Sequence, residues 1–433
     1  MLAFSAGPGD HRRVKPKILT TLPGYTAREF AADAAAGLTV AMVALPLSIA
    51  IAIASGATPA AGLVTAVVAG FLISFLGGSR VQIGGPTGAF IVVVYGVIAA
   101  HGFDGLLLAT LMAGVILFVA GLLRAGRLIA LIPEAVIEGF TVGIAIVIAA
   151  SQLKDLLGLS TGPLPADFVE KLPELWAARG TLSLAALTIG LGTIAAIFAL
   201  RRLAPRMPGP IVAIAVASAA AALLILPIDT VGSVYGALPN GLPWPDLPPI
   251  SFEKISELFP SALVIAFLAG VESLLSAIVA DRMIGGAHRS NAELLAQGAA
   301  NIASPLFGGL PATGAIARTA TNVRAGGRTP VAGIVHALVI LAVMAFAAPL
   351  AGYLAMPALA GLLMVTAWTM TEPHRWPERL RAPAGDRFLM FLTMVLTVFA
   401  DLAVAIAVGT AIGLAQRLLR QDAPPAEWTP PER

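Results

Sequence analysis

The stretch Gly84-Gly85-Pro86-Thr87-Gly88-Ala89-Phe90 decides the architecture, together with a later stretch of similar pattern, Leu310-Pro311-Ala312-Thr313-Gly314-Ala315-Ile316-Ala317-Arg318. Both combine proline with Thr-Gly-Ala and a large apolar residue, and both open a short apolar helix. In a membrane, such helix breaks are tolerated only where the freed backbone is buried in protein or faces a watery cavity. Each half-helix start carries unpaired N–H groups and a partial positive charge, so two facing starts predict an anion site.

The composition indicates a polytopic membrane protein. Of the 433 residues, 58% are hydrophobic and 12% are charged, whereas soluble domains carry about 25% charged residues. The sequence contains no cysteine, which excludes disulfides and thiolate chemistry. Residues 1–30 are polar and basic, so no cleavable signal peptide is expected. We expect a bacterial-type inner (plasma) membrane location, with the lipid bilayer as a partner and no nucleic acid.

Fourteen apolar runs predict an all-α chain with fourteen transmembrane segments. Most of the 27 Lys and Arg residues fall on one side of the membrane if both termini are cytoplasmic, as the positive-inside rule predicts. The runs are 33–54, 59–77, 86–100, 105–123, 132–152, 181–200, 209–227, 260–281, 293–306, 312–323, 330–349, 354–370, 387–401 and 402–418.

The spacing of the two Thr-Gly-Ala motifs predicts an internal repeat. Thr87 and Thr313 are 226 positions apart (313 − 87), and the same offset carries Asp33, at the start of the first run, to position 259, next to Pro260 at the start of the eighth. Two copies of seven segments are inverted because seven is odd, and segments 3 and 10 are the half-helices. The expected division is a cytoplasmic tail (1–30), a first repeat (31–228), an external linker (229–256), a second repeat (257–420) and a disordered cytoplasmic tail (421–433).

Arg318 is the strongest single functional signal. It lies about one and a half turns into the tenth segment, and a charge at membrane depth costs about 2.5–3.5 kcal/mol on insertion scales. We interpret Arg318 as a fixed positive charge that attracts an anion to the half-helix starts. The structural alternative is that it snorkels to the cytoplasmic side or pairs with a carboxylate.

Glu272 lies mid-span in the eighth segment, and Ser276 shares its helix face at i+4. An intramembrane carboxylate marks an ion pathway by default. Glu272 is therefore predicted to couple transport to a proton, while Glu272 and Ser276 together offer oxygens to a sodium ion as a second possibility. The structural alternative is a permanent ion pair with Arg318.

The remaining candidate ligands are hydroxyl and backbone N–H groups around the two helix breaks. A threonine at such a break is also a plain N-cap, and a serine that bonds back to its own helix is the main alternative for Ser48. His336 is interpreted as a packed core residue. The candidate substrate ligands are Thr87, Gly88, Ala89, Thr313, Gly314, Ala315 and Ser48, in addition to Arg318.

Short motifs distributed over about 30–420 form a wider pattern. They are Ala36-Gly37-Leu38-Thr39-Val40, Gly77-Gly78-Ser79-Arg80, Ile132-Pro133, Gly139-Phe140-Thr141-Val142-Gly143, Ser151-Gln152-Leu153-Lys154-Asp155, Glu272-Ser273-Leu274-Leu275 and Ser290-Asn291-Ala292-Glu293-Leu294, with the two Thr-Gly-Ala stretches. Together they resemble the SulP (sulfate permease) anion-transporter family, which includes prestin. The resemblance implies a 7+7 inverted repeat split into core and gate domains, with the substrate between segments 3 and 10.

Three departures from the family refine these expectations. Most members carry a cytoplasmic STAS domain after the last segment, and none is expected within this sequence. Many members have Glu or Gln at the position of Leu47, so the expected proton site moves to Glu272. Animal members place Phe where this chain has Thr87, which makes this stretch look more like bacterial C4-dicarboxylate and bicarbonate members.

These observations predict a secondary active transporter that moves an anion (C4-dicarboxylate, sulfate or bicarbonate) by alternating access. The coupling ion is a proton or, as a second choice, sodium, with no other cofactor and no metal. A homodimer is implied by the resemblance alone. The rival interpretations are a passive anion channel or voltage-driven motor, and a nucleobase permease of similar architecture. An enzyme is disfavoured because the sequence shows no His-Glu-x-x-His motif, Ser–His pair or carboxylate cluster.

Overall fold

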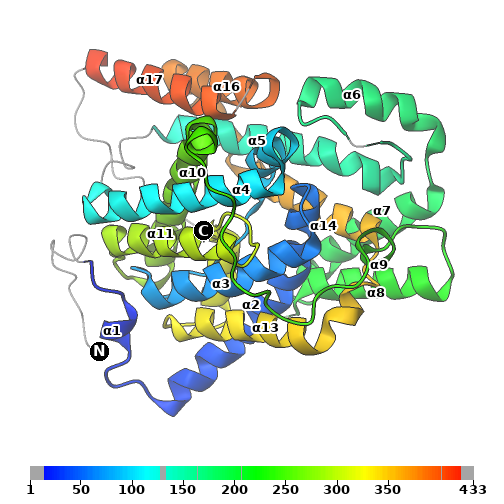
Figure 1. Ribbon diagram of the computed structural model, residues 1–433, viewed down its shortest axis with the longest axis horizontal. Coiled ribbons are helices and arrows are strands. Elements are labelled where there is room, and N and C mark those ends of the chain that lie inside the picture. The colour runs from blue at the N-terminus through cyan, green and yellow to red at the C-terminus, as the bar shows by residue number, and fades with distance from the viewer. Residues whose placement is uncertain (1–13, 127–132, 163, 206, 401, 421–433) are drawn as a thin grey trace.

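The computed structural model describes residues 14–126, 133–162, 164–205, 207–400 and 402–420, and these are predominantly helical (Figure 1). The expected disordered tail, 421–433, lies outside the described residues. The elements are α1 (Ile18–Thr21), α2 (Ala27–Ala54), α3 (Pro59–Leu76), β1 (Gly84–Gly85), the 3-10 helix η2 (Gly88–Phe90), α4 (Ile91–Leu122), α5 (Glu134–Leu157), α6 (Phe168–Ala177), η4 (Ala178–Thr181), α7 (Leu184–Leu203), α8 (Gly209–Leu223), α9 (Val231–Tyr235), α10 (Phe252–Ile284), α11 (Ser290–Leu306), β2 (Thr313–Gly314), α12 (Ile316–Arg324), α13 (Val331–Ala351), α14 (Met356–Met370), η5 (Pro373–Arg375), α15 (Trp376–Arg381), α16 (Ala384–Phe399) and α17 (Leu402–Arg420).

Seven helices of the described chain are long and apolar enough to cross a membrane: α2, α3, α4 with η2, α5, α7, α10 and α13. Two of the expected runs, 86–100 and 105–123, correspond to the two parts of α4, which are separated by a break in the helical backbone at Gly102, where φ is 71° and ψ is 179°. Other expected segments are shorter, and α12 has only nine residues. The number of fourteen crossings therefore stays a prediction, while the helical membrane architecture is plain.

Two helices begin earlier than the apolar runs indicate because polar caps start them. Thr26 accepts a hydrogen bond from the Glu29 N–H and the Glu29 carboxylate accepts one from the Thr26 N–H, so α2 begins at Ala27. Ser251 accepts from the Lys254 N–H, so α10 begins at Phe252 and carries Pro260 inside it. The expected linker 229–256 thus contains α9 and the first turn of α10.

The helices pack as two bundles. The crossover bundle contains α2, α3, α4, α10, α11, α12 and α13, and the flanking bundle contains α5, α7, α8, α14, α16 and α17. Contacts are dense within each bundle and sparser between them, where α2 meets α14, α8 and α5, and where η2 and α4 meet α5. In Figure 1, α3, α4 and α11 lie near the centre, while α7 and α8 lie at the right. The helices of the two halves of the chain pack against each other in a symmetric way. Helix α4 of the first half packs on α10 and α11 of the second, and α13 of the second half packs on α2 and α3 of the first.

Paired glycines allow a close helix crossing in the crossover bundle, between α4 and α11. A Cβ at Gly298 would lie 2.5 Å from the Phe118 nitrogen, and one at Gly114 would lie 2.6 Å from the Ile302 nitrogen. Small residues at such crossings let helix backbones approach closely, which is how helices associate in lipid. The α4–α11 contact in turn fixes the helix that leads to β2.

A buried carboxylate, Glu293 of α11, holds the chain that leads into β1. Its side chain is fully buried, and its Oε2 accepts hydrogen bonds from the N–H groups of Gly78 (2.9 Å) and Ser79 (3.3 Å). Its Oε1 accepts from the Ser273 hydroxyl (2.9 Å) and the Gln297 amide (3.1 Å). Glu293 therefore ties α10, α11 and the segment before β1 together, although the sequence singled out only Glu272 as a carboxylate inside a span.

Replacing Gly298 by alanine is expected to lower the stability of the protein by about 1–3 kcal/mol, because the added methyl group overpacks the α4–α11 crossing. The matched control is Gly192→Ala in α7, where a Cβ would meet nothing within 4 Å. The midpoint of thermal unfolding in detergent should fall for Gly298→Ala and stay level or rise for Gly192→Ala. Equal midpoints for the two variants would contradict the close crossing.

Replacing Glu293 by glutamine is expected to lower the free energy of unfolding by about 2 kcal/mol. The amide nitrogen of glutamine cannot accept hydrogen bonds, so buried N–H or O–H donors lose their acceptor. The control is Glu253→Gln, an exposed carboxylate in the first turn of α10. The same thermal measurement should show a lower midpoint only for the Glu293 variant.

Candidate functional site

The two Thr-Gly-Ala stretches meet in the middle of the crossover bundle. Strand β1 pairs antiparallel with β2, with Gly84 opposite Gly314 and Gly85 opposite Thr313. The Ala315 N–H extends this pairing by donating to the Ile83 carbonyl (2.8 Å). Neither short strand can satisfy its backbone by itself, and each unpaired group at membrane depth would cost several kcal/mol. The strand pairing therefore supplies hydrogen-bond partners to backbone groups that the two helix breaks would otherwise leave unpaired.

Polar side chains complete the hydrogen bonding around the crossing. The Asn301 amide clamps Ala312, accepting from its N–H and donating to its carbonyl, both at 2.9 Å. The Thr319 hydroxyl accepts from the Ile83 N–H (3.1 Å), and the Asn322 amide donates to the Val81 carbonyl (2.8 Å). These three residues were not among the predicted site residues. Their amide and hydroxyl side chains lie within apolar runs, and this position could have indicated that they satisfy buried backbone groups.

Arg318 lies in the first turn of α12 and is only 2% exposed. Its Nη2 donates to the Pro86 carbonyl (3.0 Å) and to the Ser48 hydroxyl (3.2 Å). Its Nη1 is buried without a hydrogen-bond partner in the described part of the protein. Gly85, whose φ of 147° favours glycine, leaves the space that Nη1 occupies, because a Cβ there would collide with it. Arg318 thus reaches the first helix break and does not snorkel away.

Glu272 reaches the same place from α10. The Thr87 hydroxyl donates to Glu272 Oε2 at 2.9 Å, and Thr87 makes no capping bond to its own helix. The Glu272 side chain is half-buried, and the described residues include no salt bridge between Glu272 and Arg318. The alternative of a permanent ion pair is therefore not what this structure contains. The cation and the carboxylate instead flank Pro86 and Thr87 separately.

Two candidate ligands from the second stretch use polar groups inside the protein. The Thr313 hydroxyl donates to the Ala269 carbonyl of α10 (2.8 Å), and the Ala315 N–H donates to the Ile83 carbonyl (2.8 Å). Gly314 lies opposite Gly84 in the strand pairing, and helix α12 begins two residues later at Ile316, which is 38% exposed. The first N–H groups of α12 have no partner within their own helix.

The first helix start lies at the boundary between the two bundles. Gly88 and Ala89 are buried, and a Cβ at Gly88 would contact Met370 of α14 at 3.3 Å and Ile148 of α5 at 3.7 Å. The Ser276 hydroxyl, in contrast, lies 3.2 Å from the Thr319 hydroxyl and is fully buried, so it does not join Glu272. The structure thus brings together Ser48, Pro86, Thr87, Glu272 and Arg318, with Gly88 and Ala89 beside them.

Histidine 336 is fully buried in α13, and neither ring nitrogen has a hydrogen-bond partner among the described residues. The expectation of a packed core residue agrees with its burial, but its nitrogens are not satisfied by the protein. Groups of His, Cys, Asp and Glu that could hold a metal ion do not occur in the described chain.

The chain is similar to known membrane transporters along most of its length. The model of the sulfate permease family matches residues 30–393. A putative sulfate transporter of Bacillus subtilis, YvdB, is 43% identical over 388 residues, covering 89% of this chain and 73% of the relative. The bicarbonate transporter BicA of Picosynechococcus is 33% identical over 404 residues, covering 89% of this chain and 69% of the relative.

The fold is similar to a solved transporter structure. The transmembrane domain of a cyanobacterial bicarbonate transporter BicA has a TM-score of 0.79 at 31% identity, covering 88% of this chain and 98% of that domain. These matches come from a family of membrane transporters and not of enzymes. This multi-pass membrane protein therefore belongs to the sulfate permease (SulP) family of anion transporters.

Proposed function

We propose that this chain is a secondary active transporter that moves a small anion by alternating access. The observation that carries the proposal is Arg318, a buried cation whose Nη1 has no partner in the described protein and which lies between the two helix starts. An anion would supply the missing acceptor and offset the cost of burying the charge. The anion is a C4-dicarboxylate, sulfate or bicarbonate, and the last two appear in the names of the relatives.

The binding residues are Arg318, Thr87 and the N–H groups of Gly88 and Ala89, with Ser48 holding Arg318 in place. Thr313 and Ala315 act by fixing the second helix start, because the Thr313 hydroxyl and the Ala315 N–H are already bonded, and Gly314 holds the strand pairing opposite Gly84. The open N–H groups at the start of α12 would then complete the anion site. Their partial positive charge adds to that of the guanidinium.

The two bundles provide the moving parts. Their sparse contact supports movement of the crossover bundle, as a core, against the flanking bundle, as a gate. The paired exchange of contacts between α4 and α13 supports the inverted repeat. The protein would lie in a bacterial-type plasma membrane with both termini in the cytoplasm, and it would act as a homodimer.

Glu272 would couple the anion to a proton. It is half-buried, bonds to Thr87 and is not neutralised by a salt bridge in the described chain, so its charge can respond to the occupancy of the site. Protonation would remove the repulsion between this carboxylate and an arriving anion. The Ser276 hydroxyl faces Thr319, which supports a proton over sodium as the coupling ion.

The experiment that tests this function is uptake of labelled fumarate, sulfate and bicarbonate into proteoliposomes under an inward proton gradient or an inward sodium gradient. We expect saturable uptake of at least one anion, faster with the proton gradient. Uptake driven only by sodium would overturn the proton coupling. Absence of uptake under every gradient, or an unsaturable anion current in planar bilayers, would overturn the carrier itself.

Replacing Arg318 by alanine is expected to weaken anion binding at least tenfold, because a charge-assisted hydrogen bond to a buried site contributes about 1.5–3 kcal/mol. The control is Arg324→Ala, which removes an exposed charge from the last turn of the same helix. The Kd of the transported anion, measured by calorimetry on purified protein, should rise only in the Arg318 variant. An unchanged Kd in a folded Arg318→Ala protein would contradict the assignment.

Replacing Glu272 by glutamine retains an oxygen that can accept the Thr87 hydrogen bond but removes the titratable group. Uptake should no longer respond to a proton gradient, whereas exchange of internal for external anion should continue. Glu253→Gln, on the exposed first turn of the same helix, is the control and should keep the response. Full proton-driven accumulation by the Glu272 variant would show that another group carries the proton.

A further inference from the structure

Helix α6 buries a lysine together with Leu175, while its exposed face carries both apolar residues and the acids Glu170 and Glu174. Its lysine, Lys171, is 3% exposed, whereas Val169 is 49% and Trp176 is 69% exposed. Apolar and aromatic residues that face outward from a short helix suit the membrane interface. The side chain that water would solvate best is therefore turned into the protein, where its burial carries a cost.

The Lys171 ammonium has few partners for a buried cation. It donates to the Ser151 hydroxyl at 2.8 Å and lies 5.4 Å from the centre of the Tyr95 ring. The described residues include no salt bridge to it, and Asp167, the acid that influences it, accepts the first N–H groups of α6. Burial lowers the pKa of the Lys171 amine. A neighbouring anion would offset this cost.

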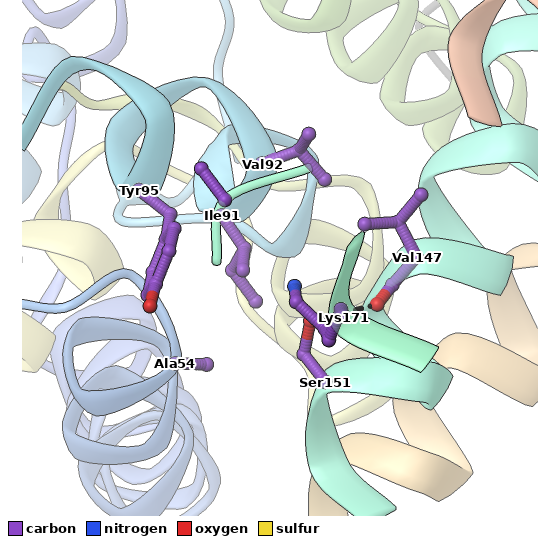
Figure 2. A pocket seen from close by; sticks show the side chains of 8 residues that line it. Ala54, Ile91, Val92, Tyr95, Val147, Ser151 and Lys171 are labelled. Carbon is purple, nitrogen blue, oxygen red and sulfur yellow. Dashed lines mark hydrogen bonds between the residues drawn. The ribbon is translucent and has the colours of Figure 1, made fainter. Parts of the chain in front are cut away.

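The ammonium faces a small pocket on the boundary between the two bundles (Figure 2). Tyr95 and Ala54 line one side from the crossover bundle, and Val147, Ser151 and Lys171 line the other. The free space is about 10 Å³, enough for roughly one water molecule. The Tyr95 hydroxyl also donates to the Leu164 carbonyl (2.6 Å), which joins the two sides just before α6.

This pocket lies on the same boundary as the candidate anion site. Gly88 faces Ile148 of α5, and Ser151 follows Ile148 by about one helical turn. On the other side, Tyr95 follows Thr87 by about two turns, which is about 12 Å along the helix. One line of contacts between α4 and α5 therefore runs from the Arg318 site to Lys171.

We propose that Lys171 forms a second, outer binding site for the transported small anion, a proposal that rests on the anion-transport function proposed above. In this structure the Lys171 ammonium donates to the Ser151 hydroxyl, which occupies the position that an oxygen of the bound anion would take. When the two bundles separate at this end, the pocket widens and the ammonium exchanges Ser151 for an oxygen of sulfate or bicarbonate. The anion is thereby captured before it reaches Arg318. No covalent step is involved.

The test uses the absence of cysteine in the 433-residue chain. Lys171→Cys introduces a single thiol, and an aminoethyl thiosulfonate restores a positive charge there, whereas an uncharged thiosulfonate of similar size does not. Uptake of labelled sulfate and bicarbonate is measured in right-side-out and inside-out vesicles. Lys254→Cys, at an exposed position in the first turn of α10, is the matched control.

We expect Lys171→Cys to raise the KM at the external face about tenfold, as loss of one charge-assisted contact should, and to leave the KM at the cytoplasmic face within about twofold. The aminoethyl reagent should return the external KM toward the wild-type value, and the uncharged reagent should not. The Lys254 variant should respond to neither reagent.

Several outcomes would overturn the outer site. An unchanged external KM, an equal rise of both KM values, or equal rescue by the two reagents would each show that Lys171 only holds the closed boundary. If Lys171→Cys does not fold, Lys171→Arg serves instead: it should keep the external KM, and a tenfold rise would contradict the proposal. A wild-type protein that transports neither probe would overturn the proposed function itself.

Discussion

The backbone of two interrupted helices must be satisfied at membrane depth, and this constraint underlies the rest of the structure. The Gly84–Gly85 and Thr313–Gly314 segments solve it by pairing with each other. Once they pair, the two helix starts are brought to one place, and α3, α10 and α11 must surround them to exclude lipid. The buried amides and hydroxyls of Asn301, Thr319 and Asn322 follow from the same need.

The pairing also explains how a cation and a carboxylate can share a small space without neutralising each other. Arg318 is held by a backbone carbonyl and a serine, and Glu272 is held by a threonine. Neutral partners fix the positions of both side chains, so the two charges attract each other through space without forming a direct salt bridge. A direct salt bridge would be difficult for a substrate to displace, because separating two buried charges is costly.

The sequence predicted the features that depend on local chemistry. Proline and glycine pairs marked the helix breaks, and the cost of charge in a membrane singled out Arg318 and Glu272. It could not predict which donors remain open, because that depends on pairing between segments far apart in the chain. Thr313 and Ala315 look like ligands from their motif, yet Ala269 and Ile83 occupy their polar groups. Glu293 was missed because its partners, Gly78 and Ser79, lie in the other half of the chain.

The hydrogen bonds that complete the crossing have a consequence for how the protein is made. They join residues more than 200 positions apart, such as Thr65 with Leu310 and Val81 with Asn322. Synthesis proceeds at about 5–20 residues per second, so the first half waits on the order of ten to forty seconds for its partner. During that interval the backbone around Gly84 and Gly85 is already in the membrane without its strand. The pairing therefore cannot form before the second half has been made, and protection of the unfinished first half until then becomes a requirement of biogenesis.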